Sequence, residues 1–235
     1  MKFKYFLLIS PILSFIFFEI LFFFSRIYLL LIFITDLLII NAILLFILIG
    51  EQIGNFWPII IQGILLVLGN SLFLLLLSQT IFYHLFLIIF NFLYWLFLDT
   101  IYNLLYRPRL YQPYSLEKIS YWLTFINLFC FAAELNALPI FYNLLFQLTL
   151  LPFFILCFWF YFYLLRINKL EIWSKLETIL IFSLILTEFY FVFNLLPLNF
   201  HLTGLILASL YVIILKVWLF KKRSMLPIVT NRQKK

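Results

Sequence analysis

The stretch from residue 58 to residue 98 contains 41 residues and not one Asp, Glu, Lys or Arg. A single helix of that length would be about 60 Å long, roughly twice the hydrocarbon thickness of a bilayer. The run therefore predicts two membrane-spanning helices joined by a tight turn. We place the turn at Ser78-Gln79-Thr80, the only polar cluster near the middle of the run.

The composition of the whole chain agrees with a membrane protein. Hydrophobic residues make up 67% and charged residues 11%, whereas soluble domains average about 45–50% and about 25%. Collagen, coiled coils and disordered chains need far more Gly, Pro or charge. Strands of a membrane barrel would alternate apolar and polar residues, but these runs are apolar throughout. The sequence predicts an all-α, polytopic transmembrane helix bundle, with residues 1–235 forming a single integral membrane domain.

The same length rule, applied to the other apolar runs, predicts about eight spans. Polar breaks and prolines separate them, and residues 139–143 mark the turn after the fifth span. The tail after the last span, residues 221–235, is basic and expected in the cytoplasm. The predicted spans are approximately 5–24, 27–49, 58–77, 81–98, 119–139, 143–166, 176–196 and 201–220.

The basic residues predict the orientation. With eight spans, fifteen of the sixteen Lys and Arg residues fall on one side of the membrane, and only Arg26 falls on the other. Cytoplasmic loops carry such an excess, so both termini are expected inside the cell and the protein in the plasma (inner) membrane. The net charge of +7 then reflects topology and attraction to anionic lipid at the cytoplasmic face. No nucleic-acid partner is expected.

Six ionisable side chains fall within or at the outer ends of the spans. An ionisable group in the hydrocarbon region costs about 2.5–3.5 kcal/mol on insertion scales and suggests a function. Counted along the spans, the four acids lie about 8–14 Å below the outer surface, and the two histidines lie at it. We predict an outward-facing polar pocket lined by Glu19, Asp36, Glu134, Glu188, His84 and His201. For Glu19 an ion pair with Arg26, seven residues away, is the alternative.

One face of the fifth span adds a seventh candidate, Asn127. Polar or small side chains recur there at steps of three and four residues, which places them on one side of a helix. That side is expected to point inward. The residues are Tyr121, Thr124, Asn127, Cys130 and Glu134.

No motif identifies a reaction. Cys130 and Cys157 each sit in an apolar run, which favours buried free thiols over a disulfide. The chain has no Gly-rich phosphate loop, HExxH, GxSxG or EF-hand pattern. We therefore predict no cofactor and no metal, and the sequence assigns no catalytic residue.

Three functions fit these features. The first is a structural, assembly or partner-binding component of the cell envelope, in which the buried acids bond between helices or to a partner membrane protein. The second is a proton- or cation-coupled transporter of small solutes that uses the intramembrane carboxylates. The third is an intramembrane enzyme acting on a lipid-linked substrate.

Overall fold

The computed structural model describes residues 11–20, 53–77, 79–143, 145–168 and 176–225. Every regular element in these ranges is a helix, so the all-helical prediction is confirmed there. A short apolar helix, Pro11–Ile20, comes first and is here called the N-terminal helix. The six helices that are long and apolar enough to cross a bilayer are α3 (Ile53–Leu76), α4 (Thr80–Tyr106), α5 (Ser115–Tyr142), α6 (Gln147–Ile167), α7 (Leu176–Leu195) and α8 (Phe200–Met225).

These six helices correspond to the last six predicted spans. The predicted span 27–49, with Asp36, lies outside the described residues, as does Arg26. The predicted span 5–24 is described only over the N-terminal helix. The number eight and the cytoplasmic placement of the termini therefore stay predictions.

The uncharged run of residues 58–98 forms the predicted hairpin. α3 ends at Leu76 and α4 begins at Thr80, so the break falls at the predicted turn. α4 continues eight residues past its predicted end, because the polar groups there bond within the helix. The Asn103 amide donates to Asp99 Oδ2 at 2.8 Å, and the Thr100 hydroxyl donates to the Leu96 carbonyl at 2.7 Å.

The turn between α5 and α6 lies slightly later than predicted. α5 passes through Pro139 and continues to Tyr142, so placing the start of the turn at Pro139 was wrong. Membrane helices tolerate proline where the surrounding protein satisfies the freed backbone group. The helix stops at Asn143, whose φ of 51° lies in the left-handed region that Asn adopts readily at helix ends.

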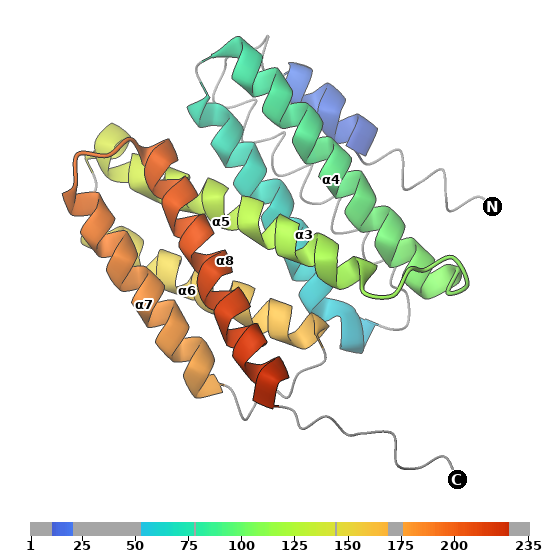
Figure 1. Cartoon of the computed structure of the whole chain (residues 1–235). Coiled ribbons are helices and arrows are strands. Elements are labelled where there is room, and N and C mark those ends of the chain that lie inside the picture. Colours follow the sequence, from blue (N-terminus) through green and yellow to red (C-terminus); the bar gives the residue numbers. More distant parts are fainter. Residues whose placement is uncertain (1–10, 21–52, 78, 144, 169–175, 226–235) are drawn as a thin grey trace.

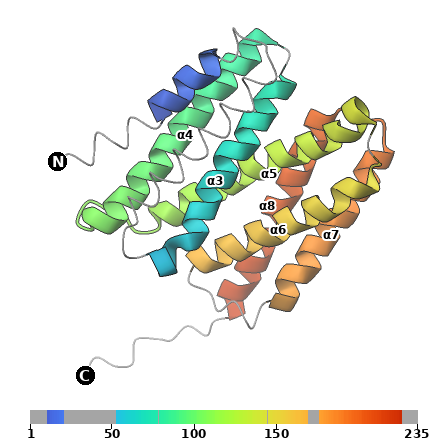
Figure 2. The same ribbon diagram turned by 180° about the vertical axis from the view of Figure 1, so that it is seen from behind.

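Successive helices run in alternating directions, and α5 lies at the centre (Figures 1 and 2). Among the described helices, it packs against α3, α4, α6 and α8, whereas α7 packs mainly against α6 and α8. The end of the bundle with the α4–α5 connection carries Arg107, Arg109, Lys118 and Arg166, and is here called the basic end. The turns after α3, α5 and α7 lie at the opposite end (Figure 1).

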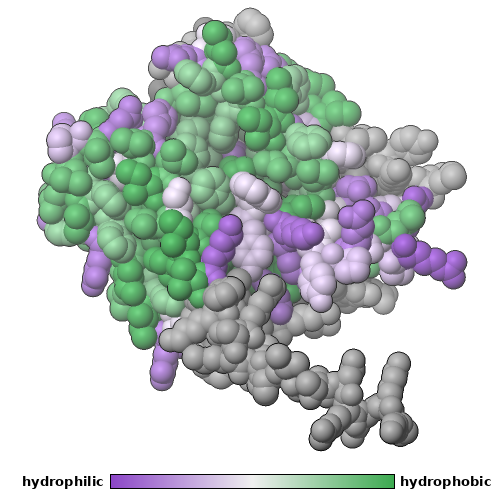
Figure 3. Space-filling view, viewed as in Figure 1, coloured by the Kyte–Doolittle hydropathy of each residue, from purple (hydrophilic) through white to green (hydrophobic). Residues whose placement is uncertain are grey.

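The surface has the polarity of a membrane protein. Figure 3 shows broad hydrophobic surface on the left, over α7, and hydrophilic residues gathered on the right, near the α4–α5 connection. Exposed apolar side chains include Leu184 on α7, Ile155 on α6 and Ile88 on α4. In a bilayer, such side chains face lipid at no cost. Membrane-spanning helices are thus supported by length, composition and surface.

Candidate functional site

A row of polar side chains runs through the interior between α3 and α5. On α5, Thr124, Asn127 and Glu134 are buried, and Glu134 is only 8% exposed. Cys130 is buried on the same face, as expected from the spacing of these residues. Gln62 and Asn70 on α3 complete this set, here called the inner row. Asn136 is also buried on α5, but it lies nine residues after Asn127 and therefore on the opposite face of the helix.

Hydrogen bonds in the inner row link the two helices. The Asn70 amide donates to Asn127 Oδ1 at 3.4 Å and to the Leu66 carbonyl of its own helix at 2.5 Å. The Cys130 thiol donates to Asn70 Oδ1 at 3.7 Å. Polar contacts of this kind hold membrane helices together where lipid provides no hydrophobic drive. Sequence reasoning missed Asn70 and Gln62 because it selected ionisable groups and the polar face of the fifth span only.

Several inner-row atoms have no hydrogen-bond partner among the described residues. Glu134 Oε1, Asn127 Nδ2, Thr124 Oγ1 and both polar side-chain atoms of Gln62 are among them. Both polar side-chain atoms of Asn136, on the other side of α5, have no partner either. Leaving a buried polar group unpaired costs about 1–3 kcal/mol. Such groups in a native protein usually mark a function or a bound water or ion.

Glu19 and His84 form a pair between the N-terminal helix and α4. Glu19 Oε1 lies 2.9 Å from His84 Nδ1, and the side chains are 27% and 36% exposed, respectively. Nearby, the Tyr83 hydroxyl donates to the Phe18 carbonyl at 2.8 Å, and the Ser14 hydroxyl donates to Asn91 Oδ1. Glu19 thus has a partner that the sequence did not predict, while Arg26 lies outside the described residues.

Glu188 occupies a different environment on α7. Its side chain is exposed and lines a shallow groove of about 470 Å³ between α6 and α7. The other groove residues are Leu150, Leu184, Thr187, Phe191 and Val192. None of the other predicted site residues that the structure describes lines this groove, so Glu188 faces the surroundings of the bundle.

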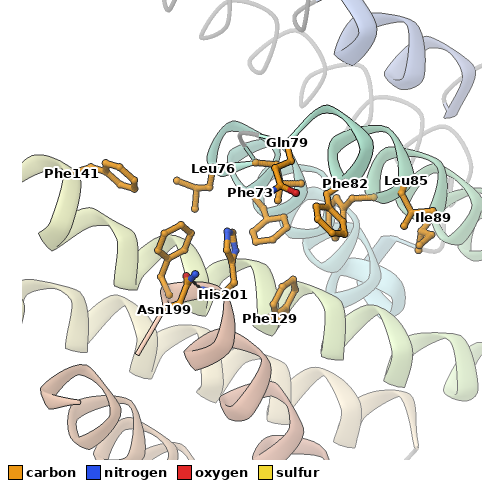
Figure 4. Close-up of a pocket in the computed structure, with 13 residues that line it drawn as sticks. Phe73, Leu76, Gln79, Phe82, Leu85, Ile89, Phe129, Phe141, Asn199 and His201 are labelled. Atoms are coloured by element: carbon orange, nitrogen blue, oxygen red, sulfur yellow. Dashed lines mark hydrogen bonds between the residues drawn. The ribbon is translucent and has the colours of Figure 1, made fainter. Parts of the chain in front are cut away.

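His201 lies in a larger pocket at the opposite end, here called the end pocket, with a volume of about 670 Å³. Figure 4 shows His201 beside Phe73, with Phe129 below them and Gln79 above. The wall is mainly apolar, and the three polar side chains come from turns or helix starts. The lining residues are Phe73, Leu76, Leu77, Gln79, Phe82, Leu85, Phe86, Ile89, Phe129, Phe141, Asn199, Phe200 and His201.

The described candidates therefore lie in four places. The structure brings Glu19 and His84 together, and it brings Glu134 and Asn127 into the inner row. His201 and Glu188 lie elsewhere, and within the described ranges no group of three His, Cys, Asp or Glu side chains could hold a metal ion. All five ionisable candidates lie toward the opposite end of the bundle. Counting residues predicts this depth, but it does not predict the direction in which a side chain points around its helix.

Comparison with known proteins identifies no relative for this arrangement. No protein-family model, curated protein or solved structure matches the chain. The function must therefore be argued from the chain's own residues.

Proposed function

We propose that this multi-pass membrane protein is a structural, partner-binding component of the cell envelope, and that a helix of another membrane protein docks against α7. The observation that carries the proposal is the exposed carboxyl group of Glu188 on an otherwise apolar face. Glu188 is the twelfth residue after Leu176 and the seventh before Leu195, so it lies well inside the span.

The apolar face around Glu188 has the spacing of a helix-packing seam. Ile181, Leu184, Glu188, Val192 and Leu195 are all exposed, and they follow one another at steps of three, four, four and three. Such steps place side chains on one face that a second helix can pack against. We call these five residues the α7 seam. Only 22% of the α7 span is buried, compared with 61% of the α5 span.

A carboxyl group facing lipid favours a polar partner. Ionisable groups in membrane helices usually pair with other polar groups, because hydrocarbon leaves them unsolvated at a cost of about 2.5–3.5 kcal/mol. Every Lys and Arg that the structure describes lies at the basic end or in the half of its helix nearer that end. A seam-to-seam contact between two copies would also bring two acids together. We therefore expect a different protein, one that places a Lys, an Arg or another hydrogen-bond donor at this depth.

Photo-crosslinking from the α7 seam tests this proposal. A photoreactive amino acid at Leu184 should form an adduct with one membrane protein in intact cells. Glu188→Leu should reduce the adduct about tenfold, which corresponds to the loss of an interhelical bond of about 1.4 kcal/mol. Glu188→Gln should retain part of it, because an amide still forms hydrogen bonds.

Glu177→Leu is the matched control, because Glu177 is an exposed acid in the first turn of the same helix but at the basic end. Its adduct yield should equal that of the unsubstituted chain. An adduct unaffected by Glu188→Leu would contradict the proposal. An adduct formed only with a second copy of this chain would replace the heterologous partner by self-association, and would also contradict it.

The inner row favours a second candidate function, proton- or cation-coupled transport of a small solute. Glu134 is a buried acid with an unpaired oxygen and lies on the same α5 face as Asn127. A carboxyl group in such a position can exchange protons with a passing solute. Flux measured in liposomes should then be lost in Glu134→Gln and retained in Glu188→Gln, with both variants correctly folded.

The third function, an enzyme acting on a lipid-linked substrate, stays a proposal without a described catalytic group. Release of a modified lipid by the reconstituted protein, detected by mass spectrometry, would favour it over the other two.

A further inference from the structure

The end pocket combines an apolar wall with a polar rim. Its volume of about 670 Å³ lies within the range of ligand-binding pockets, which is about 300–1,000 Å³. Ten of its thirteen lining residues are Phe, Leu or Ile. The other three, Gln79, Asn199 and His201, lie at the turns of the opposite end, where a bilayer would change from hydrocarbon to headgroups.

The apolar wall extends from this rim toward the middle of the span. Phe82, Leu85 and Ile89 on α4 are exposed and lie three and four residues apart, so they share one face of the helix. From Gln79 to Ile89 the helix rises about 15 Å. The pocket thus extends along α4 toward the middle of the span. The exposed apolar side chains beside it would let a hydrocarbon chain enter from the bilayer.

The polar rim offers hydrogen-bond donors. Asn199 Oδ1 accepts the backbone N–H of His201 at 3.1 Å, which leaves the Asn199 amide N–H groups for a ligand. The His201 ring packs against Phe200, with ring centroids 4.1 Å apart, and against Phe73, at 5.5 Å. Its ring nitrogens have no hydrogen-bond partner among the described residues. Among the described residues that line the pocket there is no carboxylate, so the rim suits an acceptor such as a phosphate better than a cation.

We infer that the end pocket binds a membrane phospholipid, with one acyl chain along Phe82, Leu85 and Ile89 and its phosphate near Gln79, Asn199 and His201. A water-soluble solute would leave the apolar wall uncovered, and a protein helix about 10 Å across would be too wide for a pocket of this volume. The polar rim and the apolar wall together match the polarity of a lipid along the membrane normal. This inference is independent of the docking proposed at α7.

Photolabelling in vesicles tests the inference. The protein is reconstituted with phosphatidylglycerol that carries a diazirine in one acyl chain, and the labelled peptides are mapped after irradiation. We expect labelling concentrated on residues 82–89. Ile89→Trp adds a larger side chain at the part of the pocket nearest the middle of the span, and it should reduce this labelling about tenfold. Ile213→Trp, at an exposed site on α8 outside the pocket, is the matched control and should leave it unchanged.

Two further arms test the headgroup. His201→Leu should reduce labelling by phosphatidylglycerol about fivefold, which corresponds to one hydrogen bond of about 1 kcal/mol. A diazirine-bearing diacylglycerol, which lacks the phosphate, should label the pocket weakly in the unsubstituted protein and in His201→Leu. Equal labelling by the two lipids would contradict a phosphate contact. Labelling spread evenly over the α7 seam and residues 82–89, or unaffected by Ile89→Trp, would show annular lipid only and overturn the site.

Discussion

Glu134 on α5 and Glu188 on α7 are the same residue type in the same half of the bundle, yet their surroundings are opposite. Glu134 is buried at the centre, on the face that carries Asn127 and Cys130. Glu188 is exposed at the edge, in a groove lined mostly by apolar side chains. The difference follows from packing, because among the described helices α5 packs against four neighbours and α7 against two.

This contrast separates two uses of a carboxyl group in a membrane. A buried acid such as Glu134 is surrounded by the protein's own groups, including the polar side chains of the inner row. An acid facing lipid has no such environment, so a second molecule is the most favourable source of hydrogen bonds. Four pairs of variants test whether α5 and α7 differ in this way.

The largest expected difference comes from placing a basic residue at each of the two acids. Glu134→Lys places an ammonium group in a packed interior and should lower the free energy of unfolding by about 3 kcal/mol or more. Glu188→Lys should change it by less than about 1 kcal/mol, because an exposed lysine can extend toward the membrane surface. Denaturant unfolding of both variants in detergent measures the difference, and equal losses would refute the contrast.

Removing the carboxyl group from the α7 seam should favour membrane insertion. In a translocon insertion assay of the isolated α7 segment, Glu188→Leu should improve the apparent insertion free energy by about 2–3 kcal/mol. Thr187→Leu, at the neighbouring half-buried position, is the control and should give much less, because its hydroxyl already bonds to the Ser183 carbonyl at 2.8 Å. Similar gains for both changes would mean that Glu188 is not the costly group.

A change at the contact between α5 and α8 tests how tightly α5 is packed. A Cβ atom added at Gly204 would lie 2.8 Å from the Phe129 carbonyl oxygen and 3.1 Å from the Ala133 nitrogen. Because these are backbone atoms, Gly204→Ala should force the helices apart and cost about 1–2 kcal/mol. Leu184→Ala on the exposed seam should cost under about 0.5 kcal/mol. Thermal unfolding in detergent compares them, and a larger loss at Leu184 would reverse the contrast.

The smallest expected difference lies in two serines. Ser120 on α5 bonds to the Tyr163 hydroxyl of α6 at 2.9 Å, whereas Ser183 on α7 donates to the Ile179 carbonyl of its own helix at 2.7 Å. Ser120→Ala should cost about 0.6–1 kcal/mol and Ser183→Ala less. A double-mutant cycle with Tyr163→Phe should show coupling for Ser120 and none for Ser183.

The sequence alone predicted the elements that depend on length and polarity. The uncharged run of residues 58–98 had to fold as a hairpin, and its turn fell at the polar cluster. The α5 face with Asn127 and Glu134 followed from helical spacing. These predictions succeed because the bilayer fixes the length of a span and the helix fixes its period.

The predicted grouping of the acids depended on information that the sequence does not contain. Glu19 pairs with His84 because the N-terminal helix packs on α4, a neighbour relation that local spacing cannot reveal. The exposed position of Glu188 likewise depends on which side of α7 packs against α6 and α8, and local spacing does not show this. In lipid, an apolar helix surface is equally stable facing tails or other helices, so periodicity does not determine which face is buried.

The contact of α8 with α5 has a consequence for synthesis. Gly204 packs against α5 at Phe129 and Ala133, but the ribosome makes Phe200 58 residues after Tyr142. At a synthesis rate of about 5–20 residues per second, α8 begins to be made about 3–12 s after α5 is complete. During that interval an insertase or chaperone has access to the α5 surface that α8 later covers. The contact between α5 and α8 therefore forms only after α8 has been synthesised.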